Sequence, residues 1–443
     1  PRGHLASSWL FLLPLVVCAS FYGPQNLVWF KTAPIETRLL FVALMLASAA
    51  TYALAFLTVP IGWIQRLTPS FSSFRQAAPR AASLCLLAFA ALLIVSCGTA
   101  EKIPLLEAFL GATGGELTVY REMFLRARVD PLGKVLNYGY SIFTNSLAPL
   151  AITAAFYRGT WWRHIALAIL VIGLSLTLAK SALFAAAFPL VALFLMQRRY
   201  IAAASTFVAF IIGLGAMYYA ASGRIGADFV FPEPVVAEGT VLTGNGERVP
   251  ARRARARASK PADAQVVNGS VTPDHFNLLG RDDALSLAIN RLAWIPYITA
   301  LDWMRNGAET LQGKLLLGQS IKPLAKLTGR EPIYLDRAVA SYQWGQNTTG
   351  TASSNAVYVM DAWLNFGIVG VLVYSAVVAL IIRLIVATED PPLIAAAVVP
   401  VWTLCFQALP PMLFSGGIAF LVLVALVSLA AKGEQAPCSR AAR

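Results

Sequence analysis

The sequence predicts an all-α polytopic membrane protein with about ten transmembrane helices. Hydrophobic residues make up 58% of the 443-residue chain and charged residues only 13%, proportions typical of a chain whose solvent is lipid. The apolar residues gather in spans long enough to cross a bilayer or nearly so. Arginine and lysine concentrate in the short segments between these spans, as membrane topology requires.

Ten apolar spans set the predicted topology. They lie near 8–23, 39–59, 81–97, 136–157, 164–178, 182–196, 201–221, 356–382, 393–410 and 412–431. Because short basic loops stay in the cytoplasm, the basic residues assign alternate segments to that side. The residues concerned are Arg2; Arg66, Arg75 and Arg80; Arg158 and Arg163; Arg198 and Arg199; Arg383; and Lys432, Arg440 and Arg443. An even number of spans then places both termini in the cytoplasm.

This topology divides the chain into four parts. They are transmembrane helices one to seven over 1–221 with a first outward loop near 98–135, a large outward loop over 222–355, helices eight to ten over 356–431, and a cytoplasmic tail over 432–443. Long segments are translocated largely regardless of charge. Any chemistry is therefore expected on the outward side.

The large outward loop has two different halves. Residues 222–275 are rich in proline, glycine, alanine and charge and have few residues able to build a core, so a flexible excursion is expected. Its basic run 251–260 could bind an anionic glycan or lipid headgroups, while a solvated loop is the simpler interpretation. Residues 282–350 are predicted to be helical from their apolar periodicity, with Pro296 bending the first helix.

A lone lysine, Lys180, lies in the middle of an apolar stretch of about 33 residues, 164–196. One helix of that length would measure about 50 Å, against a hydrocarbon core of about 30 Å. Two short helices joined at Lys180 fit better, and the arginines flanking the stretch then place Lys180 on the outward side. A cation deep in a membrane costs roughly 2.5–3.5 kcal/mol, which makes Lys180 a functional candidate.

Several function classes lack their usual signals. The net charge of +13 lies largely in short loops, where it sets orientation, so no nucleic-acid partner is expected. The five cysteines have no metal-ligand spacing. The chain contains no P-loop, no zinc-protease or serine-hydrolase motif, and no pair of aspartates spaced to chelate a metal. We therefore expect neither a cofactor nor an obligatory metal.

Several cations gather on the predicted outward side. They are Arg121, Arg126 and Arg128 in the first outward loop, Lys180 at the helical turn, and Arg291 in the large loop. Arginine binds phosphate oxygens bidentately and lysine supplies a compact charge, so these side chains could together hold a pyrophosphate. The alternative for the three loop arginines is that they anchor a helix end, with Glu122 and Asp130 as ion-pair partners.

A second polar cluster opens the eighth span. One of the residues 353–355 is expected to cap the helix, whose free amides attract anions, so Asn355 is a candidate substrate-binding residue. Asp361 would lie one to two turns inside the membrane. A carboxylate there requires a cation such as Lys180 or Arg291, or a proton. Asp361 is therefore either one member of an ion pair that locks two helices or a catalytic group.

Short motifs follow one another in a fixed order over about 120–385. They are a polar span with Asn145 and Pro149, a basic turn, Lys180-Ser181, the loop residues Arg291 and Pro296, Leu316-Leu317-Gly318-Gln319-Ser320, Ser354-Asn355-Ala356, and Asn365-Phe366-Gly367 with Gly370. Their order and topology resemble the bacterial oligosaccharide repeat-unit polymerases, the Wzy-type O-antigen polymerase family. The basic excursion over 222–275 departs from that pattern.

The resemblance implies a GT-C-like polymerase/ligase bundle with a periplasmic loop domain. Such an enzyme polymerises undecaprenyl-pyrophosphate-linked repeat units by glycosyl transfer at the periplasmic face of the bacterial inner membrane. The outward cations would stabilise the leaving pyrophosphate. Asp361 or Glu122 would take the proton of the acceptor hydroxyl, with His275 as a weaker candidate. The implied partners are the lipid-linked oligosaccharide, the lipid bilayer and a chain-length regulator protein.

Two other functions compete with polymerisation. An O-antigen ligase, which transfers glycan to lipid A core, shares the bundle but is expected to have an outward histidine near the end of the large loop. His275 comes too early for that. A transporter or flippase for lipid-linked sugars would use inverted repeats and broken helices. Short helices around Lys180 fit that description, whereas no internal repeat is evident.

Overall fold

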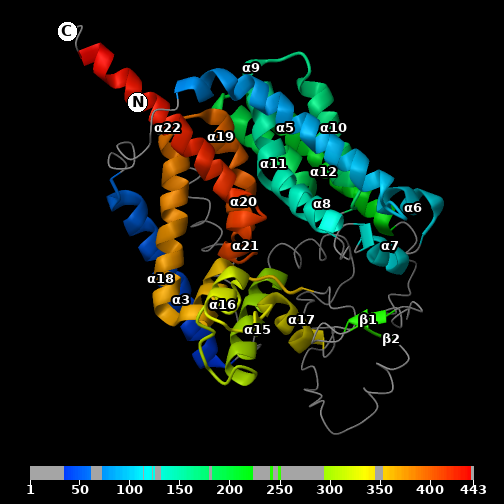
Figure 1. The fold of residues 1–443 in the computed structure, drawn as a ribbon, viewed down its shortest axis with the longest axis vertical. Coiled ribbons are helices and arrows are strands. Elements are labelled where there is room, and N and C mark those ends of the chain that lie inside the picture. The colour runs from blue at the N-terminus through cyan, green and yellow to red at the C-terminus, as the bar shows by residue number, and fades with distance from the viewer. Residues whose placement is uncertain are drawn as a thin grey trace.

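The computed structural model describes residues 34–60, 72–112, 114–121, 123–124, 131–178, 182–222, 240–242, 248–250, 294–344 and 353–440. Over these residues the chain is an elongated bundle of helices with a smaller group of helices at one end (Figure 1). The predicted span near 8–23 lies outside the described residues.

The first half of the bundle contains α3, α5 and α8 to α12. The bounds are α3 (Ile35–Thr58), α5 (Ser72–Gly98), α6 (Pro104–Leu110), α7 (Gly114–Arg121), α8 (Pro131–Ile142), α9 (Ala148–Arg158), α10 (Arg163–Ser175), α11 (Ala182–Met196) and α12 (Tyr200–Ser222). A π-helical turn, η3 (Phe143–Leu147), joins α8 to α9, because Pro149 has no amide hydrogen to continue the regular ladder.

The second half contains a group of three short helices at one end of the bundle, followed by the last helices of the chain. The bounds are α15 (Ile295–Glu309), α16 (Lys322–Leu327), α17 (Leu335–Trp344), α18 (Tyr358–Ala387), α19 (Pro391–Ala396), α20 (Val398–Thr403), α21 (Leu409–Phe414) and α22 (Ile418–Arg440). Two three-residue antiparallel strands, β1 (Thr240–Leu242) and β2 (Arg248–Pro250), pair within the segment for which no regular structure was predicted. Pro296 lies in the first turn of α15, where a proline is tolerated. The part of the predicted helix before residue 294 lies outside the described residues, so the bend at Pro296 stays a prediction.

Three of the described helices are long and apolar enough to cross a membrane: α3, the first 18 residues of α12, and α18. Shorter apolar helices of 10–17 residues lie at Ser83–Gly98, Arg163–Ser175, Leu183–Met196, Pro391–Thr403 and Ile418–Leu429. Together they support a helical membrane protein. The predicted span over 393–410 is interrupted, since Pro400 and the proline pair before Met412 divide it into short helices.

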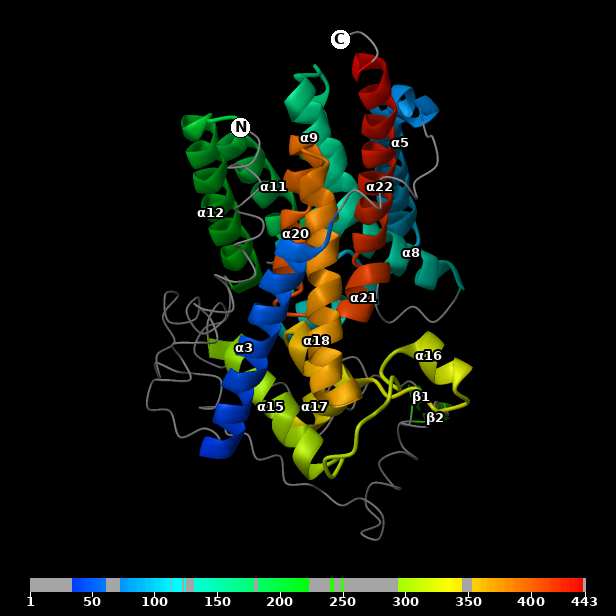
Figure 2. The ribbon, with the colours of Figure 1, turned by 90° about the vertical axis from the view of Figure 1, so that its left-hand side faces the viewer.

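The two ends of the bundle differ in character. The arginine pairs of the turns after α9 and α11 lie at the same end as the last residues of α18 and α22 (Figure 2). The other end carries α6, α7 and the helices α15 to α17 (Figures 1 and 2). The bundle is thus polarised, with short basic turns at one end and the longer connecting segments at the other.

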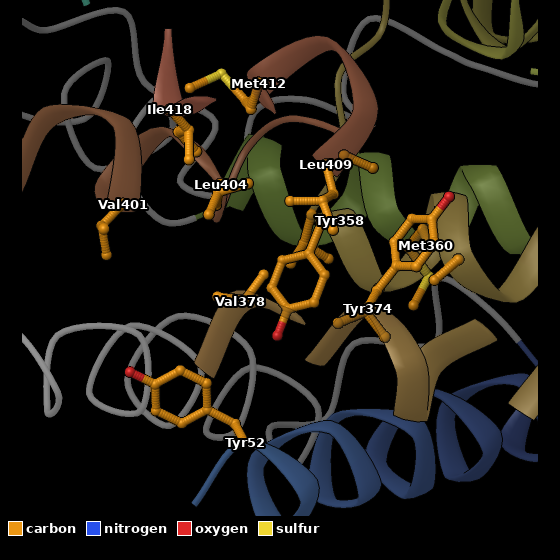
Figure 3. Packing of buried hydrophobic residues seen from close by; sticks show 14 of the residues in the cluster. Tyr52, Tyr358, Met360, Tyr374, Val378, Val401, Leu404, Leu409, Met412 and Ile418 are labelled. Carbon is orange, nitrogen blue, oxygen red and sulfur yellow. The ribbon is translucent and has the colours of Figure 1, made fainter. Parts of the chain in front are cut away.

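The main hydrophobic core joins α3, α15 and α18 with the last helices. The ring of Phe41 meets the edge of Tyr297 with centroids 5.9 Å apart, which ties α3 to α15. Figure 3 shows Tyr358 among Val378, Leu404 and Leu409, deep in this cluster. A second core forms between α5, α9, α10 and α11. The group α15 to α17 therefore packs onto the rest of the bundle through α3 and α18.

A hydroxyl cluster inside this core links α3 to two parts of α18. Ser48 Oγ lies 2.9 Å from Tyr358 Oη and 2.7 Å from Ser375 Oγ, and all three side chains are buried. Hydrogen bonds between transmembrane helices contribute on average about 0.6 kcal/mol and at most about 1.7 kcal/mol. We expect Ser48→Ala to lower the free energy of unfolding by about 1 kcal/mol.

Thermal unfolding in detergent provides the measurement for Ser48→Ala. Ser205→Ala is the matched control, since Ser205 is exposed on α12 and its one hydrogen bond among the described residues is to the carbonyl of Ala202 in its own helix. Ser205→Ala should leave the unfolding midpoint unchanged. Equal midpoints for the two variants would show that the hydroxyl cluster does not stabilise the bundle.

Candidate functional site

The candidate site is built around a break in α18. Gly367 has φ 63° and ψ −150°, which interrupts the helix and is a conformation that residues with a side chain avoid. Ser48 contacts both Tyr358 and Ser375. In a continuous helix these two residues would be about 25 Å apart. The first segment of α18, 358–366, therefore folds back against the second.

A small residue lets the two segments approach closely. A Cβ built on Gly370 would collide with the backbone carbonyl oxygen of Ala362, in the first segment. The ring of Phe366 lies 6.4 Å from that of Tyr374. The sequence predicts one continuous span near 356–382, in which both glycines would belong to an uninterrupted helix. The structure corrects this interpretation, because the glycines form a re-entrant turn.

The break leaves backbone carbonyls of α18 without partners in the helix, and residues 316–318 supply the missing donors. The amide of Leu316 donates to the carbonyl of Leu364 at 3.0 Å, and that of Leu317 donates to the carbonyl of Asn365 at 2.9 Å. The amide of Gly318 donates to Asn365 Oδ1 at 3.2 Å. A segment more than 40 residues earlier in the chain thus completes the hydrogen bonding of α18.

Asp361 lies on the re-entrant segment with one carboxylate oxygen well bonded. Oδ1 accepts hydrogen bonds from Ser320 Oγ at 3.0 Å and from Asn365 Nδ2 at 3.1 Å. Asn365 Nδ2 also lies 2.7 Å from Ser320 Oγ and 2.8 Å from the carbonyl of Asp361. Asn365 is fully buried. These three side chains form a compact polar cluster at the break.

The other carboxylate oxygen of Asp361, Oδ2, is buried without a hydrogen-bond partner among the described residues. The whole residue is only 3% exposed. Buried carboxylate oxygens are rarely left without a partner, because burial removes their bonds to water. Within the described residues no ion pair reaches Asp361. From the sequence, a carboxylate at this depth is expected to have a cation beside it or to carry a proton. The described residues supply two neutral donors instead, Ser320 and Asn365, and both bond Oδ1.

Tyr374 adds a second buried group without a partner. Its hydroxyl makes no hydrogen bond among the described residues, and it lies close enough to Asp361, across the break, to feel the charge of that carboxylate. Asp336, on α17, also lies close enough to interact with Asp361. Burial raises the pKa of Asp336 above its usual value. The site therefore brings Asp361, Asp336 and the phenol of Tyr374 near one another. The two buried oxygens without a partner, Asp361 Oδ2 and Tyr374 Oη, belong to the two segments of α18 before and after Gly367.

The structure places few of the predicted site residues together. Glu122, Arg126, Arg128, Lys180 and Arg291 lie outside the described residues. Arg121 is the last residue of α7 and is exposed. Ser320 is part of the Leu316–Ser320 motif, but the sequence does not indicate that it belongs to the site. The structure shows that its hydroxyl donates to Asp361. Tyr374 was missed, because one tyrosine in an apolar span has no distinctive sequence signal.

Asn355 does not cap α18. The helix begins at Tyr358, its N-cap is Val357, and no side chain caps it. The amide of Tyr358 instead donates to the carbonyl of Leu404 at 3.3 Å. Asn355 itself is exposed, and its neighbour Ser354 donates its amide to the carbonyl of Asp336. The cap prediction is wrong, because the chain enters the helix buried inside the core and not at a membrane surface.

The described residues contain no group of three or more histidine, cysteine or acidic side chains that could hold a metal ion. Comparison with known proteins gives no match for this chain: no protein-family model, no curated protein and no solved structure is detectably similar to it.

Proposed function

We propose that this protein polymerises undecaprenyl-pyrophosphate-linked oligosaccharide repeat units at the periplasmic face of the bacterial inner membrane. The observation that carries the proposal is the unbonded Oδ2 of Asp361 on a re-entrant helix. The segment of α18 that carries Asp361 packs against residues 316–320, which belong to the end of the bundle that carries α15 to α17, away from the basic turns (Figure 2). A buried carboxylate oxygen without a partner is suited to accept a proton from a substrate hydroxyl.

The proposed reaction is a glycosyl transfer. The acceptor hydroxyl gives its proton to Asp361 Oδ2 while its oxygen bonds to the anomeric carbon of the donor. The bond from that carbon to the pyrophosphate breaks, and the pyrophosphate leaves with the electron pair. Ser320 and Asn365 hold the carboxylate by Oδ1, which leaves Oδ2 directed away from them. Because Asp361 is almost fully buried, covering residues must move before an acceptor sugar reaches it.

The pyrophosphate would be held by cations, which is the role proposed for Lys180, Arg291, Arg121, Arg126 and Arg128. Preplaced cations stabilise charge that develops on a leaving group, so this step needs no metal. Glu122 is the alternative base. The proposed topology keeps ten spans and both termini in the cytoplasm. It is supported by the arginine pairs gathered at one end of the bundle, where positive loops are retained.

A transporter of lipid-linked sugars is the second candidate. The break at Gly367 favours it, because transporters bind their substrates at discontinuous helices within the membrane. Buried carboxylates also serve as proton relays in such proteins. The two candidates differ in one observable product, since only a polymerase makes a new glycosidic bond.

Reconstitution in liposomes tests the proposal. With an undecaprenyl-pyrophosphate-linked repeat unit as substrate and EDTA present, we expect a ladder of products on a gel together with released undecaprenyl pyrophosphate. Empty liposomes provide the control. Substrate that crosses the bilayer without a new bond would establish the transporter instead. Neither product nor movement of substrate would contradict both candidates.

A further inference from the structure

The segment 314–330, which includes α16, is basic and exposed on its outer surface. It contains four basic residues and no acidic residue, namely Lys314, Lys322, Lys326 and Arg330, all of them exposed. None of the four forms an ion pair with a described residue. Glu331 follows directly, so four exposed cations stand against one exposed carboxylate, and this excess of positive charge attracts an anionic partner.

Exposed leucines accompany these cations. Leu327, between Lys326 and Arg330, is 83% exposed, and Leu317 is 48% exposed. The apolar surface continues onto α18, where Ile368 and Val369 are 46% and 63% exposed just after the break. Figures 1 and 2 both place α16 beside this end of α18. The basic segment therefore adjoins an apolar helix face of the kind that contacts lipid tails.

A membrane interface offers an anionic and an apolar partner at the same place, and the apolar helices of this chain already favour a membrane as its surroundings. We propose that the segment 314–330 binds the phosphate-bearing headgroups of anionic phospholipids, with Leu317 and Leu327 inserted among the acyl chains. Basic segments with exposed leucines bind membrane surfaces in this way. Lysine stems can lie along apolar surface while their charges reach the phosphates.

This binding is linked to the polar cluster at the break. Ser320 lies in the same segment and donates to Asp361, while the amides of residues 316–318 bond to Leu364 and Asn365. A headgroup bound to Lys322 and Lys326 stabilises the contacts between residues 316–320 and α18, because moving this segment away from α18 would also break its bonds to the lipid. The inference does not depend on the proposed function, since either candidate would use the same surface.

Hydrogen exchange in nanodiscs tests the inference. We expect the amides of residues 316–318 to exchange about tenfold more slowly in nanodiscs with phosphatidylglycerol than in nanodiscs of phosphatidylcholine alone. Lys322→Gln/Lys326→Gln should remove this difference without changing the exchange of α3 or α18. Lys102→Gln/Lys134→Gln is the matched control, because these two exposed lysines lie outside the segment. The control should keep the full difference.

Three results would overturn the inference. One is equal exchange of the wild-type protein in the two lipids. Another is a full lipid dependence in Lys322→Gln/Lys326→Gln. The last is a control variant that loses the difference in exchange between the two lipids as fully as Lys322→Gln/Lys326→Gln does. That result would mean that the total charge of the protein, and not this segment, attracts the lipid.

Discussion

Replacing Asp361 with asparagine should lower polymer formation by about 10²- to 10⁴-fold, the usual contribution of a general base. Asparagine retains a carbonyl oxygen that can accept the hydrogen bonds from Ser320 and Asn365. It cannot take the proton of an acceptor hydroxyl. The loss should therefore appear in the rate of bond formation, measured as ladder growth in reconstituted liposomes, while the thermal unfolding midpoint changes little.

The matched control for this substitution is Asp390→Asn. Asp390 precedes α19, which lies at the end of the bundle away from α15 to α17 (Figure 1), so the variant removes one carboxylate of the same size away from the site. It should polymerise as the wild type does. Unchanged activity in Asp361→Asn would remove Asp361 from the chemistry and make Glu122 the next residue to replace. Lost activity together with a much lower unfolding midpoint would instead indicate a structural role.

Substituting either glycine at the break should destabilise the protein strongly. Gly370→Ala places a methyl group against the carbonyl of Ala362, and backbone atoms cannot move aside as side chains do. We expect a loss of about 3 kcal/mol, at the upper end of overpacking effects. Gly367→Ala forces alanine into a conformation that costs about 1–3 kcal/mol.

Glycines in open surroundings provide the controls for these variants. A Cβ on Gly98 or Gly215 would meet no atom within 4 Å, so alanine there should leave the unfolding midpoint unchanged or raise it slightly. Thermal unfolding in detergent compares all four variants. If Gly370→Ala unfolds at the same temperature as Gly215→Ala, the two segments of α18 are not packed as the structure shows.

The apolar spans could be predicted because hydropathy is a local property of the sequence. The span near 39–59 corresponds to α3 and the span near 201–221 to α12, each within a few residues. The reversal of α18 could not be predicted in this way. The residues on both sides of Gly367 are apolar, and hydropathy carries no information about the direction of the chain.

The contacts of Asp361 show the same limit for the site. Its position inside a membrane segment was sufficient to mark it as a candidate. Its donor Ser320 lies 41 residues away in sequence, and the pairing depends on how α16 folds against the break. The cap assigned to residues 353–355 failed for a related reason. A capping preference assumes a helix that starts at a surface, whereas α18 starts inside the core at the carbonyl of Leu404.

The re-entrant segment of α18 also restricts how the protein can be made. The carbonyls of Leu364 and Asn365 depend on the amides of residues 316 and 317, and lipid offers no substitute donor. A ribosome synthesises those donors before residues 358–366, so the donors exist when the re-entrant segment emerges. We expect this segment to reach its final place only once residues 316 and 317 have packed beside it, and therefore later than a span that satisfies all of its own hydrogen bonds.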